Sequence, residues 1–96
     1  MTGTNISSDL QTADAAVLDR RGILTGVQLI SDLTNDMSLI IYDNASAATG
    51  VVLFKGQLVG TEDSKYIRLP DGGIRCTNGL FADVTGTGAA YIVHYR

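Results

Sequence analysis

The last third of the chain, residues 72–95, reads GGIRCTNGLFADVTGTGAAYIVHY and decides the fold class. Two alternating apolar runs, Leu80–Val84 and Ala89–Tyr95, flank the glycine-rich segment 85–88. Glycine supplies the positive φ angles that tight turns between strands demand. The stretch therefore predicts the closing hairpin of a β-sandwich.

Similar apolar runs continue toward the N-terminus. Ile23–Ile30 carries apolar residues on both faces, which indicates a central strand covered on both sides or one near a subunit interface. Met37–Tyr42 follows after the turn 32–36, and we expect these two runs to pair as antiparallel neighbours. The small-residue loop 43–50 suits a crossing from one sheet to the other.

Weaker patterns fill the remaining length. Ala13–Asp19 favours a strand, with a short helix as the competing interpretation. Further strands are expected at Val51–Phe54, Lys65–Leu69 and Ile74–Cys76. Turn signals recur about every ten residues, which is typical of an all-β sandwich. The sequence thus predicts an antiparallel β-sandwich of about eight strands, jelly-roll or Ig-like, and leaves the strand order open.

The 96 residues, 45% of them hydrophobic, suit one domain, which we place at 13–96. Residues 1–12 are polar apart from a few side chains, so we expect an extended N-terminal arm. It is either a frayed terminus or a segment that orders against a neighbouring subunit. In the second case, Ile6 and Leu10 anchor it.

Composition argues against several classes of protein. The net charge is −3 and the basic residues are scattered along the sequence, which disfavours nucleic-acid binding. A lone cysteine, Cys76, permits neither an intrachain disulfide nor a cysteine-based zinc site. The start lacks a signal-peptide pattern, and the apolar runs are far shorter than the roughly 20 residues that span a bilayer. We therefore expect synthesis in the cytoplasm and no membrane partner.

Candidate catalytic groups are few. His94 is the single histidine. A hydrolase would need a nucleophile and a carboxylate beside it, and no sequence motif indicates such a pair. An outward-facing or interface histidine is therefore favoured. Cys76 has only Arg75 as a local cation and is expected to be a small buried hydrophobe. The glycine-rich segment 85–89 lacks the lysine and the following helix of a phosphate loop. We predict no enzymatic activity and no cofactor.

Two polar loops invite a calcium interpretation. One contains Asp32, Asn35 and Asp36, and the other contains Asp43 and Asn44. Neither has the spacing that delivers six to eight oxygen ligands, and Asp and Asn are common turn formers. Turn chemistry is therefore favoured over a metal site.

Four tyrosines offer a last possibility. Aromatic rings stack on the apolar faces of sugars, but tyrosine is equally common in strands whose edges meet solvent. A sugar-binding face would require the four tyrosine side chains to lie together on one exposed surface. The residues are Tyr42, Tyr66, Tyr91 and Tyr95.

Two segments carry a family resemblance: IYDNASAATGVVL at 41–53 and LPDGGIRCTNGLFADVTGTGAAYIVHY at 69–95. Together they resemble small tailed-bacteriophage virion proteins of the capsid decoration (cement) or head-fibre type. The similarity covers about half of the chain and consists of turns and strands, so it indicates a fold family more than an activity. It implies a structural protein that bridges and stabilises major capsid protein subunits. The alternative is a head-fibre, neck or tail accessory subunit that binds carbohydrate or a host surface.

The resemblance also implies partners. It places the protein on the capsid surface of a virion, in contact with the major capsid protein, as a homo-oligomer for which a homotrimer is favoured. The expected interface lies in the arm and on the second apolar face of Ile23–Ile30. It comprises Ile6, Leu10, Leu24 and Ile30.

Overall fold

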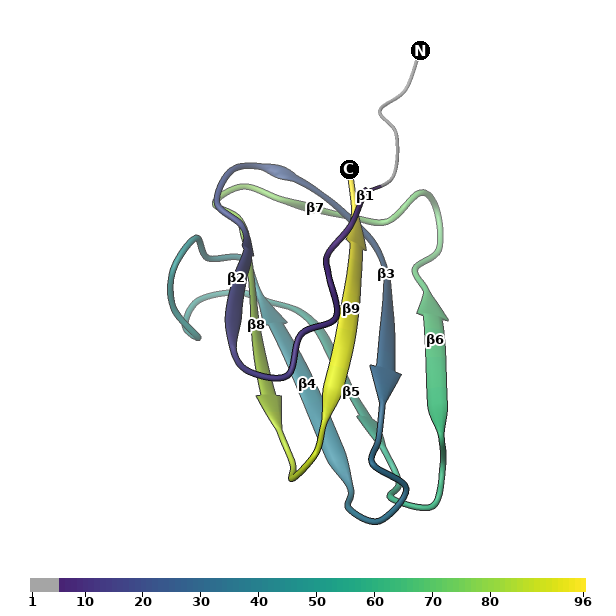
Figure 1. Ribbon diagram of the computed structural model, residues 1–96. Coiled ribbons are helices and arrows are strands. Elements are labelled where there is room, and N and C mark those ends of the chain that lie inside the picture. The colour runs from purple at the N-terminus through teal and green to yellow at the C-terminus, as the bar shows by residue number, and fades with distance from the viewer. Residues whose placement is uncertain (1–5) are drawn as a thin grey trace.

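The computed structural model describes residues 6–96, which form two antiparallel β-sheets packed face to face (Figure 1). The nine strands are β1 (Ile6–Ser7), β2 (Ala15–Leu18), β3 (Gly22–Ile30), β4 (Met37–Tyr42), β5 (Val52–Leu58), β6 (Ser64–Arg68), β7 (Ile74–Cys76), β8 (Leu80–Thr85) and β9 (Ala90–Tyr95). The predicted all-β sandwich is confirmed, with nine strands where about eight are expected. Within the described residues, no helix is long and apolar enough to cross a membrane.

The strand order is that of a jelly roll. The five-stranded sheet has the order β1-β9-β3-β6, with β7 also paired to β3, and the four-stranded sheet has the order β2-β8-β4-β5. β6 pairs with Gly26–Ile30 of β3 and β7 with Gly22–Leu24, so the two together cover one edge of β3. If β6 and β7 are counted as one interrupted strand, that strand is the sixth of eight, β8 is the seventh and β9 is the eighth. In this count, one sheet has the order 1-8-3-6 and the other has the order 2-7-4-5. Double-sheet jelly rolls share this arrangement.

The core lies between the sheets and draws on every strand except β1 and β6. Eleven of its fifteen members are aliphatic, and burying a large aliphatic side chain contributes about 1.5–3 kcal/mol. The core residues are Leu18, Leu24, Val27, Leu29, Met37, Leu39, Ile41, Phe54, Leu58, Cys76, Leu80, Ala82, Ala89, Tyr91 and Val93.

A bulge in β3 changes which of its residues face the core. The pairing with β9 shifts between Leu24 and Gly26, which inserts one extra residue into β3. Such an insertion reverses the alternation of faces beyond it. Leu24, Val27 and Leu29 are consequently all fully buried. The expectation that Leu24 and Ile30 share a second apolar face is wrong: Leu24 belongs to the core, and Ile30 lies on the outer face.

Three connections differ from the prediction. β3 and β4 do not pair, and neither do β8 and β9, because the members of each pair belong to opposite sheets. The loop 43–50, expected to cross between sheets, lies between the paired strands β4 and β5 of one sheet. Segment 86–89 crosses instead, with φ of 126° at Gly86 and 69° at Gly88. Alternation tells which side chains turn inward, but not whether consecutive strands meet edge to edge or face to face.

The described part of the expected arm lies along β9. Ile6 pairs with Tyr95, and the backbone N–H groups of Ser8 and Gln11 donate to β9 carbonyls at 2.8 and 2.9 Å. Residues 6–11 thus form a short edge of the five-stranded sheet of their own chain. Residues 1–5 lie outside the described residues.

Candidate interaction surfaces

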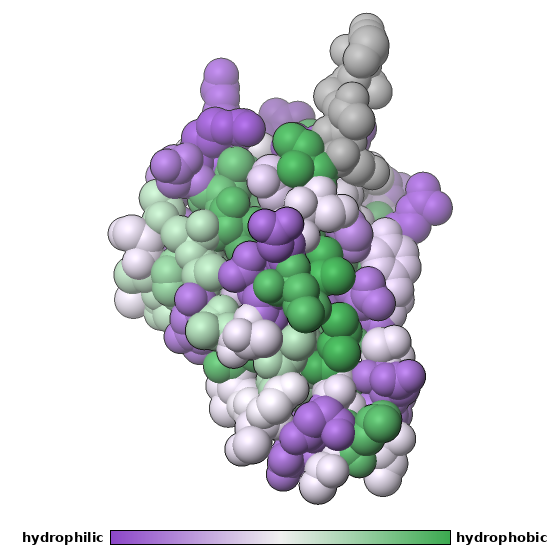
Figure 2. All heavy atoms as spheres, viewed as in Figure 1, coloured by the Kyte–Doolittle hydropathy of each residue, from purple (hydrophilic) through white to green (hydrophobic). Residues whose placement is uncertain are grey.

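Three of the four predicted interface residues reach the surface. Ile6 and Leu10 are 45% and 58% exposed, and Ile30 is partly exposed on the outer face. Ile92 also points outward, because its neighbours on β9 are buried. We call Leu10, Ile30 and Ile92 the arm patch. Ile6 is not part of it, because it lies opposite Tyr95, which packs against the core. Figure 2 shows apolar side chains gathered over β9 and the segment beside it.

A second apolar surface crosses the four-stranded sheet. Cross-strand partners form one continuous row over β2, β8, β4 and β5: Ala16 lies opposite Phe81, Phe81 opposite Tyr42, and Tyr42 opposite Val52. Val52 is 50% exposed, and the other three are exposed or half-buried. We call these four residues the outer apolar row. Sequence reasoning missed it because the row appears only when the register of all four strands is known.

The next row on this face is charged. Ile40 of β4 lies between Asp83 of β8 and Lys55 of β5. Desolvation, together with the nearby Asp14 carboxyl group, raises the pKa of Asp83 above its ordinary value. Charges therefore border the outer apolar row on one side.

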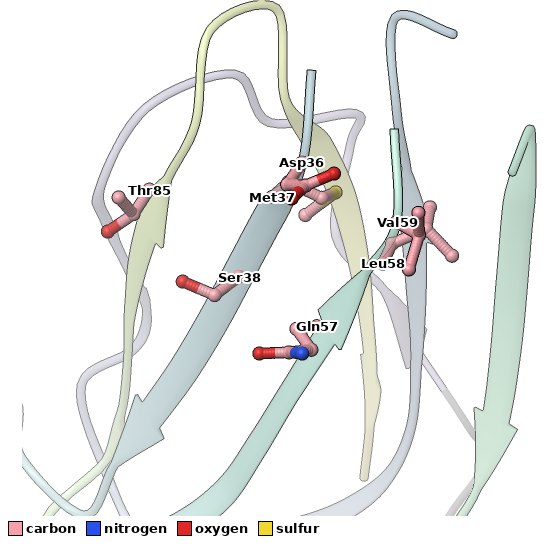
Figure 3. A pocket seen from close by; sticks show the side chains of 7 residues that line it. All are labelled: Asp36, Met37, Ser38, Gln57, Leu58, Val59 and Thr85. Atoms are coloured by element: carbon pink, nitrogen blue, oxygen red, sulfur yellow. The ribbon is translucent and has the colours of Figure 1, made fainter. Parts of the chain in front are cut away.

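The same face ends in a pocket of ≈ 240 Å³ with a mixed polar and apolar lining (Figure 3). Ser38, Gln57 and Thr85 lie in a third cross-strand row and line it, with Met37 and Leu58 at its inner edge. The carboxylate of Asp36, which also lines the pocket, already accepts a hydrogen bond from the backbone N–H of Gly60 at 2.7 Å. The pocket holds no paired nucleophile and base.

His94 lies on the outer face of the five-stranded sheet, as expected. Its Nδ1 is 2.7 Å from the hydroxyl oxygen of Ser7, and its ring meets the edge of the Tyr66 ring with centroids 5.4 Å apart. A hydroxyl is therefore within reach, but a hydrolytic relay also needs a group that orients the histidine. None of the residues 6–96 supplies a carboxylate that hydrogen-bonds to this ring.

The polar loops use their carboxylates to hold turns, as predicted. Asp32 Oδ1 accepts hydrogen bonds from the backbone N–H groups of Asn35 and Thr34 at 2.8 and 2.9 Å, and these bonds lower its pKa. Partial burial acts to raise the pKa of Asp43, but the backbone N–H groups of residues 77–79 outweigh it and hold the pKa below its ordinary value. Asp43 thereby fastens the β7–β8 turn to the end of β4.

Cys76 and the tyrosines occupy separate environments. Cys76 is fully buried in the core, as predicted, and burial raises the pKa of its thiol. Tyr91 is also fully buried, whereas Tyr66 is exposed on the five-stranded sheet and Tyr42 belongs to the outer apolar row. Tyr95 packs against the core. The tyrosines therefore do not form the single aromatic face that the sugar-binding interpretation requires.

Comparison with known proteins finds no matching family model, no similar curated protein and no similar solved structure.

Proposed function

We propose that the chain is a non-enzymatic structural protein of a phage virion. In this role it is a capsid decoration protein that bridges and stabilises major capsid protein subunits, and it acts as a homo-oligomer, with a trimer favoured. The resemblance of residues 41–53 and 69–95 to small tailed-phage virion proteins motivates the proposal. The observation that carries it is the presence of apolar side chains on the outer faces of both sheets.

Bridging requires two separate contacts, one with the capsid and one with a further copy or capsomer. The arm patch and the outer apolar row lie on different sheets, so both can be engaged at once. Each contact would be stabilised by burial of apolar surface, which contributes about 25 cal/mol of free energy per Å² removed from water. We assign the arm patch to the capsid, since it includes the chain segment beside β9, and the outer apolar row to contacts between copies.

The fold is consistent with this role by analogy alone. Double-sheet jelly rolls build viral capsid and lectin domains, but a fold does not fix a function. The single free cysteine leaves the domain without an internal disulfide. Association with neighbours would then add stability by mass action.

Binding to capsids tests the arm patch. Deleting residues 1–12 would remove β1 and its hydrogen bonds, so a point change is cleaner. Leu10→Gln places a polar amide in the patch, and Leu33→Gln is the matched control, because Leu33 is 59% exposed in the β3–β4 loop. Co-sedimentation with capsids purified without the protein should show about tenfold weaker binding for Leu10→Gln, equivalent to about 1.4 kcal/mol. The Leu33→Gln protein should bind like the wild type.

Two outcomes count against the proposal. If the wild-type protein does not bind capsids, the decoration role is wrong. If Leu10→Gln and Leu33→Gln bind equally well, the arm patch does not make the contact. Light scattering of Val52→Gln tests the outer apolar row separately, since loss of the oligomer is expected there and an unchanged mass would exclude that row.

A further inference from the structure

A groove crosses the outer face of the five-stranded sheet near the start of β3. Thr25 contributes to its floor, Tyr66 and Arg68 of β6 form one side, and Arg96 lies on the other. The loop 69–72 closes one end. Its volume of ≈ 550 Å³ falls within the range of about 300–1,000 Å³ that is usual for small-molecule sites.

The register explains how the Tyr66 ring comes to lie beside this groove. Gly26 lies opposite Arg68 on one side and opposite His94 on the other, and it has no side chain of its own. The Tyr66 hydroxyl would lie 2.9 Å from a Cβ at position 26, so the Tyr66 ring extends across the glycine and fills the space above it. The Tyr66 ring also meets the edge of the His94 ring, with centroids 5.4 Å apart.

Two polar atoms of residues in the groove lining, Arg96 Nε and Thr25 Oγ1, are buried and have no hydrogen-bond partner among residues 6–96. Arg96 Nη2 donates to the carbonyl of Gly72 at 3.1 Å, which fixes the side chain. Leaving a buried donor unsatisfied is costly, and a guanidinium can donate two parallel hydrogen bonds to an oxyanion. Asp71 is the acidic residue of the lining.

The surroundings are also cationic. A neighbouring pocket on the other side of Arg96 is lined by Arg21 and Arg75, so the fold gathers four arginines at one end of a chain whose net charge is −3. These arginines are far apart in sequence and are brought together by β3, β6, β7 and β9. The resulting positive field favours an anionic ligand.

We propose that this groove binds a small oxyanion, a phosphate, sulfate or carboxylate group, between Arg68 and Arg96. The group is either a free ion or part of a small organic molecule, in which case the exposed Tyr66 ring offers an apolar wall to the rest of the ligand. The site goes beyond the decoration role and does not depend on it.

Titration followed by amide NMR at low salt tests the site. The probes are inorganic phosphate, sulfate, glucose 6-phosphate and glucuronate, with uncharged glucose as the negative control. Saturable shifts at residues 25–26, 66–72 and 94–96 are expected with the anions and not with glucose. Equal affinity for phosphate and glucose 6-phosphate identifies a free anion as sufficient, whereas tighter binding of an organic anion shows that the Tyr66 wall contributes.

Three variants sharpen the test. Arg68→Gln and Arg96→Gln should each raise Kd at least about tenfold. Arg20→Gln is the matched control, because Arg20 is exposed, does not line the groove and changes the net charge equally; its Kd should stay within about twofold of the wild type. The proposal is overturned if no anion gives saturable shifts below about 10 mM, or if Arg20→Gln weakens binding as much as Arg68→Gln. Unchanged amide spectra of the free variants establish that each is folded.

Discussion

Replacing Tyr91 with phenylalanine removes one hydroxyl group and leaves the buried ring in place. Tyr91 is fully buried, and its hydroxyl donates a 2.7 Å hydrogen bond to the carbonyl of Ala13, on the segment that leads into β2. The change deletes this bond and leaves the carbonyl of Ala13 without that donor. A hydrogen bond of this kind contributes about 0.5–1.5 kcal/mol. Because Ala13 is an exposed residue, we add no penalty for a buried unsatisfied carbonyl. We therefore expect Tyr91→Phe to lower the free energy of unfolding by about 1 kcal/mol.

Tyr91 should also make the stability of the fold depend on pH in the alkaline range. Burial, with a smaller contribution from the Asp14 carboxylate, raises the pKa of Tyr91 to about 12. Because the folded protein holds this proton more tightly than the unfolded chain, whose tyrosine pKa is about 10, the stability is intact below pH about 10 and falls as the pH rises toward about 12. The Tyr91→Phe protein lacks this ionisation, so its stability should fall less over the same interval.

Urea unfolding followed by circular dichroism measures both effects, at pH 7 and in steps from pH 9.5 to 12. For a domain of this size, a loss of 1 kcal/mol lowers Tm by about 4–8 °C, which heating experiments can check. Equal stability of the two proteins at pH 7 would refute the hydrogen-bond argument. Parallel losses above pH 10 would refute the assignment of the alkaline transition to Tyr91.

Two further predictions concern a turn and a charged strand. Gly73→Ala should lower the free energy of unfolding by more than about 2 kcal/mol, because φ is 107° and the new Cβ would clash with the carbonyl oxygen of Leu24. Gly50→Ala should cost only about 1 kcal/mol in urea unfolding, because φ is similar, 100°, but the nearest atom to the new Cβ is the carbonyl oxygen of Asp43, in ordinary contact at 3.6 Å. Asp83→Asn should raise Tm at pH 7, because burial and a neighbouring carboxyl group raise the pKa of Asp83 and its ionised form then opposes folding. The gain should shrink as the pH falls through this raised pKa and vanish below the ordinary aspartate pKa of the unfolded chain. An equal gain at all pH values would contradict this cause.

The sequence predicts the strands well because their alternation reports directly on burial. The turn residues Asp32 and Asp43 are also recognisable, since short carboxylates hold nearby backbone N–H groups whatever the larger topology. The buried position of Cys76 follows from the same local pattern. These features depend on neighbours that are close in sequence or on one face of one strand.

The strand neighbours do not follow from the sequence, because a two-residue period cannot distinguish a hairpin from a crossing between sheets. The bulge between Leu24 and Gly26 is equally hidden, and it moves Leu24 from the expected interface into the core. The outer apolar row and the groove between Arg68 and Arg96 combine strands that are distant in sequence. Basic residues that look scattered along the chain are consequently adjacent in the fold.

The proposed decoration role is tested most directly by quantitative mass spectrometry of virions purified from the phage that we propose to encode the chain. We expect the protein to be present at a fixed ratio to the major capsid protein and to remain with the capsid through density-gradient purification. Absence from purified virions, with the protein found only in extracts of infected cells, would contradict it.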